Sequence, residues 1–106
     1  MTAATGDHSM SKPARATVQV DNELIRVTEW RYAPGEATGW HRHGYDYVVV
    51  PMTTGPLRIK SAQGEMSNDI VPGQSYFRVG GAEHDVWNPT GREVVFVEIE
   101  LKSQPR

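Results

Sequence analysis

Hydrophobic and polar residues alternate in short runs along most of the chain, and the runs end at glycine, proline, asparagine or aspartate. Alternation with a period of two is typical of β-strands, because successive side chains point to opposite faces of a sheet. No stretch repeats apolar residues at the i, i+3 and i+4 spacing for three helical turns. We therefore expect strands over residues 17–20, 24–32, 39–43, 47–52, 57–61, 65–70, 74–79, 84–87 and 93–101.

Short strands with a turn roughly every 8–12 residues favour an all-β sandwich or barrel. The 106 residues are enough for one such domain. Residues 1–16 differ from the rest, because they are rich in small and polar residues and show no periodicity. We expect them to form a disordered tail before a folded domain over residues 17–106. His8 lies in this tail, where nothing rigid would hold it as a ligand.

Composition narrows the possible partners. Without cysteine, the chain forms no disulfide and offers no thiolate to a metal. The formal net charge of -2 argues against nucleic acid, whose binding needs a basic surface. No apolar run approaches the roughly 18–20 residues of a membrane helix, and the first residues lack the apolar segment of a secretion signal. We expect a soluble, cytoplasmic protein that binds neither nucleic acid nor membranes.

Two of the four histidines, His41 and His43, are separated by one residue. On a strand this spacing places both imidazoles on one face, about 6.5–7 Å apart along the chain. Two rings at that distance can lean onto one metal ion. Gly35 and Gly39, just before the pair, allow tight backbone geometry.

A third histidine, His84, follows a pair of glycines that can reverse the chain sharply between two strands. The strand that begins there carries His84, Val86 and Asn88 on one face. Asp85 and Trp87 lie on the other face and are expected to point outward. Because His84 would stand opposite the first two histidines in a barrel, we interpret it as a third metal ligand.

These residues resemble the two sequence motifs of cupins. The first motif has a glycine, five residues, His-x-His and a later glycine, and its counterparts are Gly35, His41, His43 and, slightly late, Gly55. The second has Gly, five residues, Pro-x-Gly, two residues, His, three residues and Asn, and its counterparts are Gly73, Gly81, His84 and Asn88, with Val79 where proline is usual. The resemblance spans about residues 24–101. It implies a double-stranded β-helix, the jelly-roll barrel of cupins, with one divalent metal ion on His41, His43 and His84.

The glutamate that usually completes the cupin metal site is missing. Tyr47 stands in its place, and Asp46 lies one residue earlier. This substitution leaves three alternatives. In the first, the metal site consists of three histidines and Tyr47 lies near it as a hydrogen-bond donor. In the second, Asp46 reaches in as the carboxylate ligand, and in the third, Tyr47 caps a degenerate site that binds metal weakly. We favour the first alternative, because strand parity turns Tyr47 inward, whereas aspartate in a turn commonly bonds to backbone or water. Tyr47 is therefore the candidate catalytic residue.

The resemblance also implies a chemistry. Cupins without the glutamate resemble iron(II) dioxygenases for thiols, β-diketones and aromatic acids, so we expect a dioxygenase for a small carboxylate-bearing molecule. Iron(II) is the favoured cofactor, although zinc, nickel and manganese suit the same ligands. Residues 38–47 and 96–101 are similar to small bacterial cupins associated with β-alanine degradation. Two alternatives remain open: a non-redox isomerase or lyase in which His84 or Tyr47 transfers protons, and a non-catalytic cupin that binds a small ligand.

We also expect a homodimer, because a small barrel has little core of its own. Trp40 and Trp87 lie out of phase with the inward histidines, and Trp30 sits between charged residues. Outward aromatic rings are enriched at protein interfaces. The strand at residues 17–20 is a candidate for pairing or exchange between two copies.

Overall fold

The computed structural model describes residues 12–102, which form nine β-strands. These are β1 (Arg15–Asp21), β2 (Ile25–Tyr32), β3 (His41–Arg42), β4 (Asp46–Pro51), β5 (Leu57–Ser61), β6 (Gly64–Asn68), β7 (Tyr76–Arg78), β8 (Glu83–Trp87) and β9 (Val94–Leu101). Each matches an expected strand with its ends shifted by at most two residues. None of the described residues form a helix long and apolar enough to span a bilayer.

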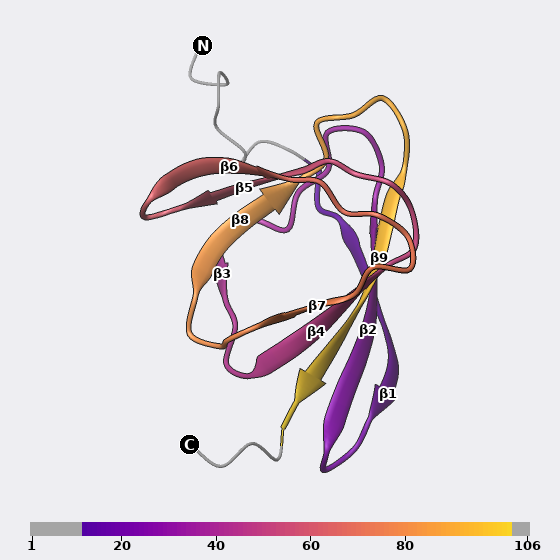
Figure 1. Ribbon diagram of the computed structural model, residues 1–106, viewed down its shortest axis with the longest axis vertical. Coiled ribbons are helices and arrows are strands. Elements are labelled where there is room, and N and C mark those ends of the chain that lie inside the picture. The colour runs from indigo at the N-terminus through magenta and orange to yellow at the C-terminus, as the bar shows by residue number, and fades with distance from the viewer. Residues whose placement is uncertain (1–11, 103–106) are drawn as a thin grey trace.

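The strands form two antiparallel sheets around a central space (Figure 1). The larger sheet has the order β1-β2-β9-β4-β7, and the smaller has the order β3-β8-β5-β6. Strands that are distant in sequence are neighbours, since β9 lies between β2 and β4, and β8 lies between β3 and β5. This interleaving of two antiparallel sheets is the jelly-roll arrangement and confirms the predicted fold class.

The larger sheet begins slightly before the expected folded region. β1 starts two residues early, at Arg15, because its first residues pair with the end of β2. Just ahead of it, Pro13 forms a β-bridge with Ala37. The rest of the expected tail, residues 1–11 with His8, lies outside the described residues. Every residue of β1 is exposed, so this strand is an uncovered edge of the larger sheet.

The core lies between the two sheets, where the inward side chains of both meet. Its buried members are Tyr32, Tyr47, Val49, Leu57, Ile70, Val86, Val94 and Phe96. On β9, Val94 and Phe96 alternate inward, and the register with β2 sets Tyr32 directly opposite Val94. Each such side chain contributes about 1.5–3 kcal/mol when fully buried. Six of these eight side chains also line the inner cavity, so the core and the cavity share a wall.

Asn88, the asparagine of the second motif, ties strands together from the end of β8. It is fully buried and donates hydrogen bonds to the carbonyl oxygens of Tyr32 (3.0 Å) and Arg92 (2.7 Å). Its own oxygen accepts from the backbone N–H of Thr90 (2.9 Å). Because all these bonds are buried or nearly so, Asn88 has a structural role and does not reach the histidines.

Two expectations about side-chain direction need correction. Trp30 packs against the core and lines the inner cavity, because its neighbours Glu29 and Arg31 occupy the outer face and form an ion pair of 2.8 Å. Asp85 is on the face opposite His84, as expected, but it is buried. The loop before β3 covers it, and the Gly39 N–H donates to its carboxylate (3.1 Å).

Candidate metal centre

Pairing within the smaller sheet brings the first and third histidines together. His41 on β3 lies directly opposite His84 on β8, and His43 follows two residues along the same face. The three rings meet edge to face, with centroids 4.7 to 4.9 Å apart. The Nε2 atom of His43 is 3.1 Å from that of His41 and 2.9 Å from that of His84. All three candidate ligands therefore direct the same ring nitrogen to one point.

The turn between β7 and β8 holds His43, which lies just past the end of β3. The His43 N–H donates to the carbonyl of Ala82 (3.1 Å), and the His43 carbonyl accepts from the Gly81 N–H (2.6 Å). Gly81 has φ of +100°, a conformation that residues with a side chain rarely adopt. The glycine of the second motif thus positions a histidine of the first.

The Nδ1 atoms of His41 and His43 each lie near an oxygen that helps to orient the ring. His41 Nδ1 is 3.0 Å from the Gly39 carbonyl oxygen. Because a carbonyl only accepts, we assign the proton to Nδ1 and the lone pair to Nε2. His43 Nδ1 is 3.8 Å from Oε2 of Glu98. In metal sites, carbonyl and carboxylate partners of this kind fix the orientation of the histidine ligands.

Burial favours the neutral form of two of the rings. It lowers the pKa of His43 to about 3, with smaller contributions from the other two histidines. It lowers the pKa of His84 to about 4, and His41 and the positive charge of Arg78 contribute. Neutral imidazole is the form that binds metal. Nitrogen lone pairs about 3 Å apart repel one another, and a cation at their common focus removes that repulsion, so this donor set fits a divalent metal.

Tyr47 and Asp46 are neighbours on β4, and their side chains point in opposite directions. The Tyr47 ring lines the cavity and stacks on His43, with centroids 4.1 Å apart and planes 23° from parallel. Burial raises the pKa of its hydroxyl above the usual range, so the phenol keeps its proton. The Asp46 carboxylate instead accepts a hydrogen bond from the Gly80 N–H (2.8 Å). Asp46 thus contacts the turn, while Tyr47 contacts the histidines.

Sequence reasoning missed Glu98, which reaches the site from β9. Its side chain is almost fully buried and lines the cavity beside His43. Burial raises the pKa of its carboxyl to about 7, Glu100 adds to the increase, and a hydrogen bond with Trp30 opposes it. The available signal was parity, because Glu98 shares the inward face of β9 with Phe96, where a charged residue needs a specific partner.

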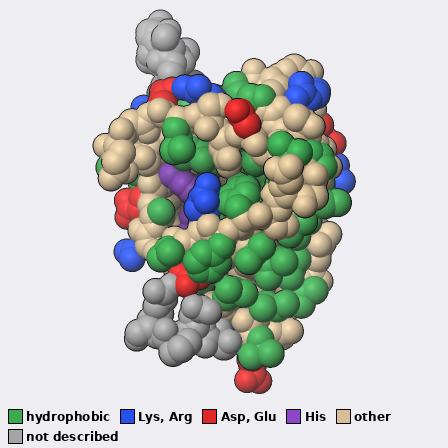
Figure 2. All heavy atoms as spheres, viewed as in Figure 1, with side chains coloured by type: hydrophobic (Ala, Val, Ile, Leu, Met, Phe, Trp, Pro, Cys, Tyr) green, Lys and Arg blue, Asp and Glu red, His purple; other side chains and the backbone are tan. Residues whose placement is uncertain are grey.

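The histidines lie in the wall of a cavity of about 550 Å³. Figure 2 shows them in a hollow on the viewed face, beside a basic side chain and among hydrophobic ones. Apolar walls come from both sheets and include Val49, Leu57, Ile59, Val86 and Phe96. A hollow of this size and lining suits a small organic molecule held by a few polar groups.

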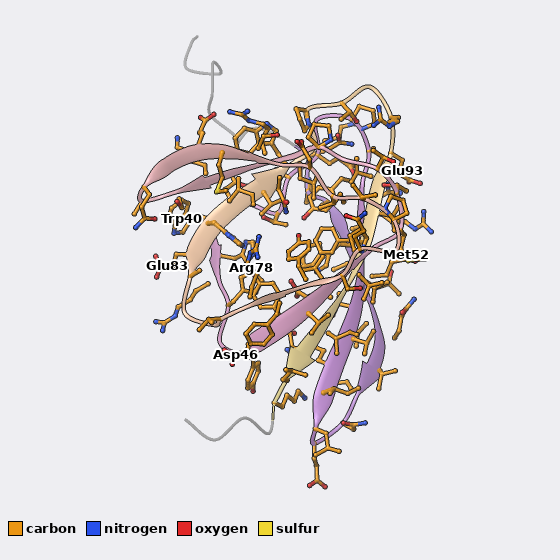
Figure 3. All side chains as sticks on the ribbon, viewed as in Figure 1. Trp40, Asp46, Met52, Arg78, Glu83 and Glu93 are labelled. Carbon is orange, nitrogen blue, oxygen red and sulfur yellow. The ribbon has the colours of Figure 1, made fainter. Side chains whose placement is uncertain are left out.

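Arg78 on β7 is the one Lys or Arg among the described residues that line this cavity. Figure 3 shows it inside the ring of strands, between β8 and β4. Its guanidinium lies 4.4 Å from the centroid of the Tyr76 ring, and its Nη1 donates to the Phe77 carbonyl (3.2 Å). In the β4–β7 register its Cα is opposite that of Tyr47. Sequence reasoning missed Arg78 as well.

A double-stranded β-helix with a histidine cluster in its hollow defines a cupin. No family model matches the chain. It is 57% identical over 86 residues to the β-alanine degradation protein BauB of Pseudomonas aeruginosa, covering 81% of this chain and 90% of that protein. The chain therefore belongs to the family of small cupins that includes BauB.

Solved structures agree with this assignment. A cupin domain from Bordetella pertussis is 56% identical, superposes with a TM-score of 0.86, and the match covers 89% of this chain and 99% of that one. The polyketide cyclase RemF of Streptomyces resistomycificus superposes with a TM-score of 0.67 at 18% identity, over 92% of this chain and 72% of that one. The second likeness concerns the fold alone.

Proposed function

We propose that this cupin is a metal-dependent dioxygenase that acts on a small carboxylate, with iron(II) held by His41, His43 and His84. The observation that carries the proposal is the convergence of the three Nε2 atoms, at 3.1 and 2.9 Å from the central one. Three neutral ligands leave the full charge of a divalent ion available to an anionic substrate. When bound, iron(II) supplies the site where oxygen and substrate react.

The overall reaction places both atoms of one O₂ molecule in the substrate. The four electrons that reduce the oxygen come from the bonds of the substrate itself, so no separate reductant is needed. The surrounding residues would bind and orient the substrate and exclude water. Apolar walls on both sheets serve the last purpose, since a dry site strengthens every polar contact within it.

Arg78 would bind the substrate carboxylate. A guanidinium forms two parallel hydrogen bonds with a carboxylate, and stacking on Tyr76 restricts its motion. The positive charge of Arg78 contributes to lowering the pKa of His84, so a carboxylate on Arg78 would lie near the histidines. The name of BauB, a β-alanine degradation protein, supports a small carboxylic acid as the class of substrate.

Tyr47 and Glu98 would assist from positions next to His43. Tyr47 stacks on the ring and keeps its phenolic proton, so it acts as a positioning residue and a hydrogen-bond donor. The Glu98 carboxylate, 3.8 Å from Nδ1 of His43, would favour the tautomer with its proton on Nδ1 and the Nε2 lone pair toward the metal.

The experiment combines metal analysis with oxygen uptake. Protein purified without a histidine tag should contain close to one divalent metal per chain, and His84→Ala should lose most of it, whereas His8→Ala should not. The iron(II) form should consume oxygen with small thiol, amino or hydroxy acids, and nickel substitution should stop the uptake. An unchanged metal content in His84→Ala would refute the metal centre.

A second function is favoured by the Glu98 carboxyl in the cavity, because a carboxyl facing a bound substrate can transfer protons. In that case the protein is a non-redox isomerase or lyase. The same experiment separates the two functions: metal binding without oxygen uptake, together with exchange of substrate hydrogen for deuterium from the solvent, would identify proton transfer. Metal and ligand binding with neither reaction would identify a binding protein.

A further inference from the structure

Three large apolar side chains lie exposed at the mouth of the cavity. Trp40, Met66 and Val79 all line it, and each is more than half exposed. A side chain that both lines a cavity and is largely exposed lies where the cavity opens to solvent. Figure 2 shows hydrophobic side chains around the hollow that contains the histidines. Because apolar surface gathered at one place in water commonly marks a binding site, this apolar rim of Trp40, Met66 and Val79 points to an apolar ligand.

The rim residues come from the edges of both sheets. Trp40 directly precedes β3, and its indole N–H donates to the carboxylate of Glu83 (3.3 Å). Met66 on β6 is opposite Ile59 on β5, which lines the cavity too. Val79 directly follows β7. Since β3 and β6 are the two edges of the smaller sheet and β7 is an edge of the larger one, the rim approaches the opening from different sides.

The cavity is much larger than an acid of three carbons requires. Its volume of about 550 Å³ corresponds to roughly 18 water molecules, because each occupies about 30 Å³ in the liquid. Propanoate has five non-hydrogen atoms, each about as large as a water molecule, so it would fill roughly a quarter of the space. Cavities of this size typically hold larger ligands that lose most of their surface to the protein.

The accessible wall of the cavity is mainly apolar and carries one cation. Half-buried Trp30 and Ile59 contribute apolar surface from the two sheets, and the rim continues it to the opening. Arg78 is the one Lys or Arg among the cavity residues that the structure describes. Its guanidinium is stacked on Tyr76, 4.4 Å from the ring centroid. A ligand that matches this wall has one anionic group and an apolar body.

We propose that the cavity binds a carboxylic acid with an apolar body of about eight or more carbon atoms, whose carboxylate contacts Arg78 and whose far end contacts the rim. The carboxylate contact rests on the proposed function. The apolar contact is a new specificity site, which selects among acids by the length of the apolar body. Each methylene group that moves from water to the apolar wall adds to the affinity, and a three-carbon acid has little such surface to bury.

The test is a chain-length series of straight-chain acids at pH 7.5: propanoate, pentanoate and octanoate, with 1-octanol as the uncharged analogue. Tag-free protein, with and without added zinc, is titrated by calorimetry. Burial of one methylene group increases affinity by up to about fourfold. We therefore expect octanoate to bind at least 30-fold more tightly than propanoate, and at least tenfold more tightly than 1-octanol, which offers Arg78 no carboxylate.

Two methionines of equal exposure provide a matched pair of variants. Met66 is 56% exposed and lines the cavity, whereas Met52 is 55% exposed and does not line it. In Figure 3, Met52 lies across the ring of strands from Trp40. Met66→Gln keeps the length of the side chain but makes it polar, so it should lower the preference for octanoate over propanoate about 3- to 10-fold. Met52→Gln should retain the preference of the parent protein.

Two further measurements accompany the pair. Both methionine variants should unfold at the temperature of the parent protein, because neither side chain is buried. Arg78→Gln should weaken all three acids by a similar factor, since it removes the contact that they share.

Equal affinities for propanoate and octanoate, an unchanged preference in Met66→Gln, or 1-octanol that binds as tightly as octanoate would overturn the inference. If Met66→Gln changes the sedimenting mass, the rim is instead an interface between copies of this chain, which overturns the inference as well. Any of these results with intact metal binding and oxygen uptake leaves the proposed function standing. Conversely, a steep series that depends on Met66, in protein that takes up no metal, would support the apolar site and refute the dioxygenase.

Discussion

Asp46 and Tyr47 are adjacent on β4, but Asp46 stabilises a turn and Tyr47 contacts the candidate metal site. Both are buried, and Tyr47 stands where a cupin usually has a glutamate, with Asp46 one residue before it. The Asp46 carboxylate faces the β7–β8 turn and accepts from Gly80, whereas the Tyr47 ring faces the cavity and stacks on His43. Because strand side chains alternate, a single strand cannot turn both residues inward.

Substitution of each residue should therefore give different results. Asp46→Ala removes the partner of a backbone N–H and should lower the free energy of unfolding by about 1–3 kcal/mol without changing the metal content. Tyr47→Phe should alter stability by less than about 1 kcal/mol, and should change turnover more than metal content. Urea unfolding and metal analysis of the folded variants test both. Loss of metal from a well-folded Asp46→Ala protein would show that the carboxylate is a ligand.

At the level of elements, the β7–β8 turn connects the two halves of the site. Its backbone fixes His43 through Gly81 and Ala82, and its neighbour Gly80 packs against the chain just before β4. A Cβ atom on Gly80 would lie 2.6 Å from the carbonyl carbon of Tyr45 and 2.7 Å from its oxygen. These are backbone atoms, which cannot move aside as a flexible side chain can. The turn therefore requires glycine at this position.

Gly80→Ala should be strongly destabilising, by about 1–3 kcal/mol or more, as expected for overpacking against backbone. It should also weaken metal binding, because the displaced turn carries the hydrogen bonds of His43. Gly91→Ala is the matched control, since a methyl group at that position would meet nothing within 4 Å. Guanidinium unfolding of both variants gives the comparison, and similar midpoints for the two would contradict this account of the turn.

At the scale of the whole molecule, β1 is an edge that a second copy would cover. The strand is exposed along its full length, and Val18 and Val20 are 55% and 42% accessible, with Leu24 at 60% just beyond. Exposed apolar edges promote pairing between chains. Trp40, which is also largely exposed, instead lies beside Glu83 and donates its indole N–H to that carboxylate (3.3 Å; Figure 3).

We expect a homodimer that pairs through β1. Sedimentation equilibrium at micromolar concentration should give twice the chain mass of 11.8 kDa. Val18→Lys should shift the protein to monomer, because it places a charge in the apolar edge, whereas Met52→Lys at another exposed position should not. A single species of 11.8 kDa in the parent protein would contradict the dimer. A dimer that survives Val18→Lys would place the interface elsewhere.

The sequence determined the strands and the direction of most side chains along them, because the period of two is a local property of extended chain. His41 and His43 share a face for this reason alone, and the glycines of both motifs mark turns that the structure contains. The jelly roll followed from the order of the two motifs through their resemblance to cupins. The strands, the turns and the shared face depend on neighbours in sequence, so one sequence was enough to predict them.

Only the tertiary structure decided which strands meet. The β3–β8 register sets His41 opposite His84, and the place of β9 in the larger sheet brings Glu98 to His43 and turns Trp30 toward the cavity. The β4–β7 register likewise brings Arg78 to Tyr47. Parity shows that these residues share an inward face, but it does not show what they face. Pairing between distant segments depends on how all the strands bury their apolar faces together, and no local pattern contains that information.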